Sequence, residues 1–234
     1  MIFKNTMLML NETAQKSGSP KGANALLISA IVVFVLGMLA YAGILFWTKR
    51  IRKKYDQKAH QEAIIKIESL RNDVGILPQE LKKIFNSKEN DYDIEGTINT
   101  IYQNSFTNAL VVSNDLYPFA CISQKTKNPI FYELESFKFD EYNKARMNPE
   151  NNLANEIKPY ENQELDFVAI FSSNQNINDL YDKYFSKLKD NGMLLVKISN
   201  FPKREINLLL NHLALEKKKH EVSYFGTKIL FVVK

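Results

Sequence analysis

The fold is decided by residues 165–198, which read LDFVAIFSSNQNINDLYDKYFSKLKDNGMLLVKI. Two continuous apolar runs in this stretch, residues 167–171 and 193–198, predict buried β-strands. Residues 178–188 lie between them and carry apolar side chains at helical spacing, and we expect this helix to stop at residues 190–192 (Asp-Asn-Gly). A strand, a helix and a second strand in this order form a βαβ unit, which predicts a parallel sheet.

The chain before this unit repeats the same alternation. Residues 109–112 (ALVV) and 130–132 (IFY) are short apolar runs that predict two more strands, with a helix between them that carries Phe119, Cys121 and Ile122. Residues 78–86 and 94–106 have the pattern of amphipathic helices. Residues 139–164 are rich in Asn, Glu and Pro, and we expect no third strand there.

The chain closes in a different way. A predicted helix over residues 205–217 leads into two predicted strands, residues 221–225 and 228–233, which are separated by Gly226 and Thr227 alone. A link of two residues allows a hairpin and is too short for a crossover, so these strands must be antiparallel. The sequence therefore predicts an α/β fold with a Rossmann-like, mostly parallel sheet that ends in an antiparallel hairpin.

A long apolar stretch stands near the N-terminus. Residues 25–47 read ALLISAIVVFVLGMLAYAGILFW and contain no Asp, Glu, Lys, Arg or His. As a helix, they would extend about 34 Å, which is enough to cross a hydrocarbon core of about 30 Å. The alternatives are a buried core helix and a cleavable signal peptide, but the apolar region of each is usually shorter. We therefore predict a single transmembrane helix.

Basic residues indicate the orientation of this helix. Five of them directly follow the apolar stretch: Lys49, Arg50, Arg52, Lys53 and Lys54. Lys16 and Lys21 are the basic residues closest to it on the other side. The positive-inside rule therefore predicts a single-pass protein of the cell membrane, with the N-terminus outside and the C-terminal domain in the cytoplasm.

The distribution of charge argues against a nucleic-acid partner. The formal net charge is +5, but residues 1–54 hold eight basic residues and one acidic residue, which leaves −2 for the remainder of the chain. The basic excess thus belongs to the membrane anchor and its cytoplasmic flank, and the partner it predicts is the lipid bilayer. Cys121 is the one cysteine, which excludes an intramolecular disulfide and a four-thiolate zinc site, and we expect no metal centre.

We therefore divide the chain into four parts. Residues 1–24 are a flexible tail, 25–48 the transmembrane helix, 49–74 a juxtamembrane helix, and 75–234 the α/β domain. The juxtamembrane helix carries a narrow apolar stripe formed by Ile64, Ile67 and Leu70. Such a stripe needs a partner, which is either the chain's own domain or a helix of another protein.

Three segments carry a family resemblance: residues 165–173 (LDFVAIFSS), 180–197 (LYDKYFSKLKDNGMLLVK) and 220–234 (HEVSYFGTKILFVVK). In this order they resemble the class I S-adenosylmethionine-dependent methyltransferases. That family has an Asp-led fourth strand, a helix ending in a Leu-Lys-x-Gly-Gly-like turn, a fifth strand and a closing hairpin; Asp166 and residues 188–192 stand at the first two places. The chain also resembles single-span proteins of mycoplasma-type bacteria that are described as methyltransferases.

The resemblance implies an S-adenosylmethionine site. Glu133, at the end of the second strand, matches the acid that holds the two ribose hydroxyls in this family, since a carboxylate can accept both hydrogens. The alternative for Glu133 is a solvated carboxylate at a strand end, and Glu135 is a second candidate for the ribose. The further cofactor-binding candidates lie in the loops after the first and fourth strands: Ser113, Asn114, Asp115 and Ser172.

The loop after the first strand departs from the family. Its glycines normally let the backbone approach the methionine part of the cofactor. Here residues 113–118 (SNDLYP) contain no glycine, and Leu116 and Tyr117 add bulk. Two functions therefore remain: a membrane-anchored methyltransferase with an altered cofactor loop, or a non-catalytic methyltransferase-like subunit that anchors a membrane-associated assembly. The sequence identifies neither catalytic residues nor a methyl acceptor.

Overall fold

A computed structural model describes residues 21–74, 76–153 and 157–234. Most of the predicted tail, residues 1–20, lies outside the described residues. The first described element is the helix α2, Lys21–Val74, which runs through 54 residues without a break. The chain divides into two compact units, Met1–Asp56 and Gln57–Lys234, and the division falls inside this helix.

The described part of the first unit is α2 from Lys21 to Asp56. Every side chain from residue 28 to residue 50 is exposed, including Phe34, Leu39 and Trp47. This is the one helix in the described part of the chain that is long and apolar enough to cross a membrane, as judged by length and composition. An apolar helix that exposes all its sides in this way has no buried face within the described chain.

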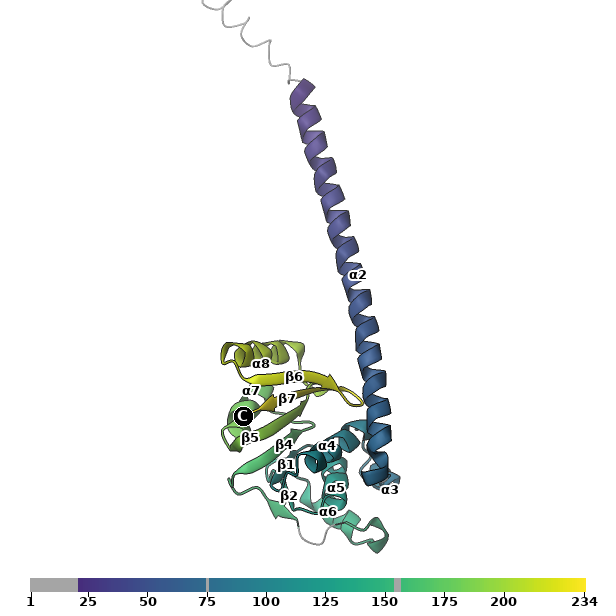
Figure 1. Cartoon of the computed structure of the whole chain (residues 1–234), viewed down its shortest axis with the longest axis vertical. Helices are drawn as coiled ribbons and strands as arrows, with labels where there is room; N and C mark the ends of the chain where they lie inside the picture. The colour runs from purple at the N-terminus through teal and green to yellow at the C-terminus, as the bar shows by residue number, and fades with distance from the viewer. Residues whose placement is uncertain (1–20, 75, 154–156) are drawn as a thin grey trace, which may run out of the picture. The chain divides into compact units, whose positions relative to one another are not determined.

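The second unit is built on a seven-stranded sheet with the order β3-β2-β1-β4-β5-β7-β6 (Figure 1). Its strands are β1 Ala109–Val112, β2 Ile130–Tyr132, β3 Lys158–Pro159, β4 Leu165–Ile170, β5 Leu188–Lys197, β6 Lys219–Tyr224 and β7 Lys228–Val233. The first five strands pair in parallel, whereas β7 is antiparallel to both β5 and β6. The predicted parallel sheet with a closing antiparallel hairpin is confirmed.

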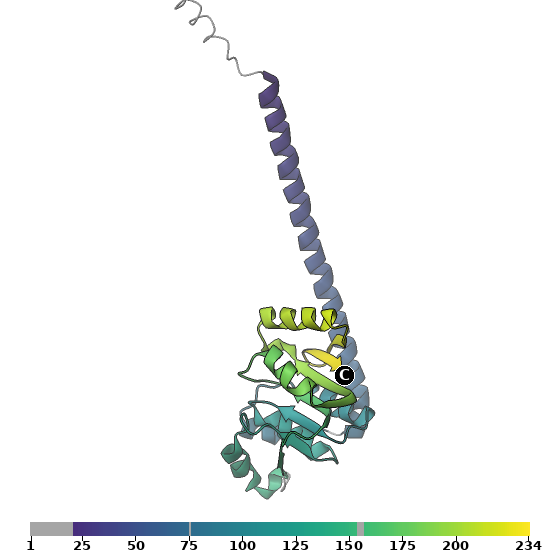
Figure 2. The same ribbon diagram turned by 90° about the vertical axis from the view of Figure 1, so that its left-hand side faces the viewer.

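Helices cover both faces of this sheet (Figures 1 and 2). They are α3 Gln79–Ile84, α4 Asp91–Gln103, α5 Leu116–Lys125, α6 Phe139–Arg146, α7 Ile177–Phe185 and α8 Lys203–Leu215. In β1, Ala109 and Val111 pack in the cluster with α4, α5 and α6, while Leu110 and Val112 pack with α7 and α8. Successive residues of a strand point to opposite faces, which is why the whole run ALVV is apolar.

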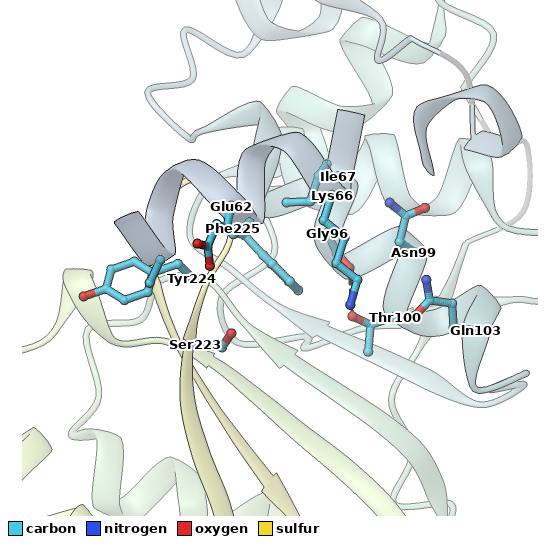
Figure 3. Close-up of a pocket in the computed structure, with 12 residues that line it drawn as sticks. Glu62, Lys66, Ile67, Gly96, Asn99, Thr100, Gln103, Ser223, Tyr224 and Phe225 are labelled. Carbon is cyan, nitrogen blue, oxygen red and sulfur yellow. Dashed lines mark hydrogen bonds between the residues drawn. The ribbon is translucent and has the colours of Figure 1, made fainter. Parts of the chain in front are cut away.

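The C-terminal part of α2, from Gln57 on, belongs to the second unit and packs on its other elements (Figure 3). Ile67 is 4% exposed and Ile64 is half-buried, while the Tyr92 hydroxyl donates a hydrogen bond of 2.8 Å to Glu68 Oε1. The side chain of Leu70, the third residue of the predicted stripe, lies outside the described part. These contacts support the alternative in which the stripe packs on the chain's own domain.

The structure corrects the prediction that no third strand exists. Two residues, Lys158 and Pro159, pair in parallel with Phe131 and Tyr132 and form the edge strand β3. An edge strand of two residues with a lysine and a proline carries neither an apolar run nor an alternation. Its position comes entirely from its neighbour β2, so no pattern in the sequence could reveal it.

The structure also moves the boundary between the helix and the strand after β4. The predicted helix, residues 178–188, ends at Phe185, and β5 begins at Leu188. Leu188 pairs with Leu165, and the register then shifts before Met193 pairs with Phe167. Asn191 adopts a left-handed φ of 65° within this irregularity. The residues Asp-Asn-Gly therefore form a bulge inside a strand, because the pairing with β4 continues on both sides of them.

Asp166 connects the amino ends of three strands. Its Oδ2 accepts hydrogen bonds from the Thr107 amide (3.0 Å), the Thr107 hydroxyl (2.7 Å) and the Asn108 amide (3.0 Å). Its Oδ1 lies 2.7 Å from Lys189 Nζ in β5. Burial opposes ionisation, but the hydrogen bonds from Lys189, Thr107 and Asn108 outweigh it and lower the pKa of Asp166 to about 2.

We predict that Asp166→Asn lowers the free energy of unfolding by about 1–2 kcal/mol at pH 7, because four donors lose an ionised acceptor. The folded-state pKa lies below the unfolded value, so this contribution is complete above about pH 4 and is lost as the pH falls toward 2. Urea unfolding of the full chain in detergent at several pH values measures the difference. Asp182→Asn, on the exposed side of α7, is the matched control, and an equal loss in both variants would contradict the prediction.

Candidate functional site

The sheet changes its winding direction between β1 and β4. From β1 the order continues to β2 and β3 on one side, and β4 and β5 lie on the other. In open α/β sheets, ligands bind outside the carboxyl ends of the strands at such a switch point. The candidate site is therefore the carboxyl edge formed by the residues that follow β1, β2, β4 and β5.

The loops after β1 and β4 are joined by several hydrogen bonds. The Asn114 amide donates to the carbonyl oxygen of Ser172 at 3.3 Å and to its hydroxyl at 3.2 Å. Ser113 Oγ lies 3.3 Å from Ser172 Oγ, and Asn114 Nδ2 donates to Asn174 Oδ1 at 3.1 Å. Three of the predicted cofactor residues, Ser113, Asn114 and Ser172, thus lie together at the switch point.

Asp115, the fourth residue predicted for these loops, caps a helix. Its Oδ1 accepts from the Tyr117 amide at 2.9 Å at the start of α5, and its Oδ2 accepts from the Ser87 hydroxyl at 2.6 Å. Its φ is −101°, and no residue from 113 to 118 has a positive φ. This loop therefore turns into α5 without the left-handed backbone for which glycine is needed.

Leu116 and Tyr117 turn away from the loop. They are 3% and 0% exposed and pack in the core below α5. The Tyr117 hydroxyl donates to Asp91 Oδ1 of α4 at 3.2 Å. The Leu116 and Tyr117 side chains are therefore accommodated in the core on the α4 side of the sheet. At the switch point the loop exposes part of Asn114, while Ser113 is buried and contacts Ser172.

Glu133 is brought to the opposite side of the sheet, against α7. It is 5% exposed; its Oε1 accepts from Lys183 Nζ at 2.6 Å and from the Tyr184 hydroxyl, and its Oε2 accepts from the Ser136 hydroxyl at 3.0 Å. Burial opposes ionisation, but the hydrogen bonds from Lys183 and Tyr184 prevail and lower the pKa of Glu133. Glu133 is thus a buried, ionised carboxylate, and the alternative of a solvated strand end is wrong.

Glu135, the second candidate for the ribose, differs from Glu133 in its surroundings. Its side chain is 74% exposed, and its Oε2 lies 3.9 Å from Lys183 Nζ. A distant ion pair at the surface contributes little to stability. Glu135 is therefore free to move in a way that Glu133 is not.

A buried ionic cluster at the end of β5 completes the carboxyl edge. Lys197 is 5% exposed, and its ammonium group contacts Glu89 Oε2 directly and lies 3.4 Å from Asp93 Oδ2. Asp93 also accepts from the backbone amide (2.7 Å) and the hydroxyl (2.9 Å) of Thr227. Burial raises the pKa of Glu89, and the bond to Lys197 offsets part of this rise.

Asn200 connects this cluster to the end of β4 through hydrogen bonds. Its Nδ2 donates to the carbonyl oxygen of Phe171 at 2.8 Å and to Glu89 Oε1 at 3.4 Å. The segment before α4, which holds Ser87 and Glu89, therefore lies against the ends of β1, β4 and β5. A lysine inside the apolar run 193–198 was the one sequence signal for this cluster, because a lysine on a buried strand needs a buried acid.

The comparisons with known proteins support the fold. The O-methyltransferase TomG from Streptomyces achromogenes, which is involved in tomaymycin synthesis and was crystallised with S-adenosylmethionine, is 7% identical, with a TM-score of 0.54 over 74% of this chain and 97% of its own. A methyltransferase from Geobacter sulfurreducens is 10% identical, with a TM-score of 0.52 over 72% of this chain and 96% of its own. No protein-family model and no curated protein matches the chain.

These neighbours define the class of fold. The second unit has the mixed α/β architecture of the class I S-adenosylmethionine-dependent methyltransferases. Among the described residues, no group of three or more His, Cys, Asp or Glu side chains could hold a metal ion. The carboxyl edge of the sheet therefore carries hydroxyl, amide and ionised side-chain groups next to the switch point.

We predict that Lys197→Met destabilises the domain by about 3–5 kcal/mol, because it leaves Glu89 and Asp93 without their buried cation. Unfolding by urea at pH 7 measures the loss. The double variant Glu89→Gln/Lys197→Met removes one of the two stranded charges and should recover a large part of it. Lys187→Met, at an exposed position, is the control. A loss in Lys197→Met no larger than in this control would contradict the assignment.

Proposed function

We propose that the chain is a membrane-anchored, S-adenosylmethionine-dependent methyltransferase with an altered, glycine-free cofactor loop. The observation that carries the proposal is the convergence of Ser113, Asn114 and Ser172 at the switch point of the sheet. This is where an open α/β sheet binds its ligand, and the structural neighbour from Streptomyces achromogenes was crystallised with S-adenosylmethionine.

The residues of the loop fit the cofactor. Asn114 and Ser172, which are partly exposed, would supply amide and hydroxyl groups for its methionine part, and Ser113 would support them from below through its contact with Ser172. The side chains of Leu116 and Tyr117 are directed into the core. Glu133 follows β2 as an ionised carboxylate, the form that accepts ribose hydroxyls. When bound, the cofactor supplies a methyl group activated by a sulfonium centre. The contribution of the protein would be to bind and orient it beside the acceptor.

Ribose binding at Glu133 requires one of the existing hydrogen bonds to this carboxylate to break. Both of its oxygens already accept hydrogen bonds, and Oε1 accepts from Lys183 and Tyr184 at the same time. A ribose hydroxyl can reach this carboxylate after Lys183, whose side chain is 42% exposed, swings away. The proposal therefore requires Lys183 to release Oε1 of Glu133, so that this carboxylate would be free to hold the ribose of the cofactor.

Membrane anchoring rests on the first unit. Its apolar side chains are exposed on all sides of α2, and a helix of this kind is stable when lipid or protein surrounds it. The basic cluster after Trp47 supports a cytoplasmic domain and an outer N-terminus. The resemblance to single-span proteins of mycoplasma-type bacteria supports the same arrangement. Such an anchor would place the enzyme near lipids and membrane proteins as methyl acceptors.

The second candidate is a non-catalytic methyltransferase-like subunit. It is favoured by the state of Glu133, which is 5% exposed and engaged by three donors, so its bonds stabilise α7 against β2. Ile65, on the juxtamembrane part of α2, is 66% exposed and would be available to a protein partner. As a non-catalytic subunit, the domain would anchor or organise a membrane-associated assembly.

Cofactor binding separates the two candidates. For the enzyme, we expect the full chain in detergent to give measurable calorimetric heat with S-adenosylmethionine, and Glu133→Gln to weaken its affinity by at least tenfold, because a charged acceptor for the ribose is lost. Glu141→Gln, at an exposed position of α6 that is not among the predicted site residues, should leave the affinity unchanged. No heat at millimolar cofactor would overturn the enzyme and support the non-catalytic subunit.

The anchor has its own test. We expect the full chain to stay in the membrane pellet after alkaline carbonate extraction, whereas a variant with Val33, Leu36 and Leu39 replaced by Glu should be released, because each buried charge costs about 2.5–3.5 kcal/mol in a transmembrane helix. The matched control replaces three exposed residues of the juxtamembrane part that lie outside the basic cluster, Gln57, Lys58 and Gln61, by Glu. Release of the unaltered chain by carbonate would contradict the anchor.

A further inference from the structure

Glu133 is covered by one side chain that is able to leave it. Of its three donors, Tyr184 is 0% exposed and packs against Tyr160, with the ring centroids 6.1 Å apart, and Ser136 belongs to the turn directly after Glu133. Lys183 differs from both, because its side chain is 42% exposed while its ammonium group lies 2.6 Å from Glu133 Oε1. Lys183 is therefore the donor whose departure would uncover the carboxylate.

A second acid lies within reach of the same lysine. Glu135 Oε2 is 3.9 Å from the Lys183 ammonium group, and the Glu135 side chain is 74% exposed. Gln175, in the loop after β4, donates to this oxygen at 3.5 Å. A hydrogen-bonded ion pair has an N···O distance of about 2.8 Å, so a movement of about 1 Å would join Lys183 to Glu135. Lys183 thus lies between a buried acid and an exposed one.

The two acids depend on Lys183 to different degrees. Glu133 is buried and needs donors to remain ionised, whereas water solvates Glu135 with or without a partner. In the free protein Lys183 therefore stays on Glu133. The hydroxyls of a ribose can replace the ammonium group there, because each of them donates a hydrogen bond to a carboxylate oxygen.

We propose that Lys183 regulates the cofactor site: in the free protein it closes Glu133, and on cofactor binding it moves to Glu135. This inference rests on the proposed methyltransferase function. Lys183 acts through Glu133 as a positioning residue, and the apparent affinity for the cofactor is reduced by the fraction of protein in which Glu133 is still closed. Lys183 therefore stabilises the fold and opposes cofactor binding, whereas a purely structural residue would support both.

Removal of the ammonium group separates these two effects. We expect Lys183→Met, in the full chain in detergent, to bind S-adenosylmethionine about tenfold more tightly by calorimetry, because a charged competitor for Glu133 is lost. The same variant should melt about 2–5 °C lower, because a buried carboxylate loses a donor. Lys183→Arg keeps the competing charge and should restore both values to those of the unaltered chain.

Lys187→Met is the matched control for the loss of charge. Lys187 is exposed and follows Lys183 by four residues, so its removal reports how a nearby positive charge affects a cationic cofactor. An equal gain in affinity in both methionine variants, or no gain in Lys183→Met, would overturn the regulation and leave the proposed function standing, since the cofactor would still bind. No heat with any of these proteins would overturn both.

The receiving acid has its own test. Glu135→Gln should weaken cofactor binding about threefold, because the released ammonium group loses its partner. Asp179→Asn removes an equal charge from an exposed position of α7, one turn before Lys183, and should leave the affinity unchanged. In the Lys183→Met background, Glu135→Gln should have no effect. A loss that persists there would mean that Glu135 binds the ribose itself, and would overturn the transfer of Lys183.

Discussion

The second unit depends on the burial of both faces of its parallel sheet. Strands β1 and β4 lie in the middle, and Leu110, Phe167, Val168, Ala169 and Ile170 are all 0% exposed. Because helices cover both faces, no polar side chain can be placed along these strands without losing its water. The polar chemistry of the domain is therefore confined to the two ends of the strands.

The two ends use this chemistry differently. At the amino end, Asp166 accepts four hydrogen bonds and joins β1, β4 and β5 in a fixed arrangement. At the carboxyl end, the polar groups are spread over separate clusters around Ser172, Glu133 and Lys197. The hydrogen bonds at the amino end therefore have a structural role. At the carboxyl end a ligand could replace internal hydrogen bonds. This replacement would be costly at Glu133, because Glu133 is buried and has three donors.

The helix α2 combines two environments in one element. Up to Arg50 its side chains are exposed on every side, whereas Ile67 is buried and Glu68 accepts a hydrogen bond from Tyr92.

Local patterns in the sequence determined the long apolar helix, the parallel strands, the closing hairpin and the position of Glu133 at the end of β2. Continuous apolar runs and a two-residue link can be read from neighbouring residues alone. The tertiary structure decided what those residues contact. Lys183 and Tyr184 reach Glu133 across about fifty residues, Lys197 meets Glu89 across 108, and Leu116 and Tyr117 turn into the core. These contacts depend on which face of the sheet each helix covers, and that is set by the packing of the whole domain.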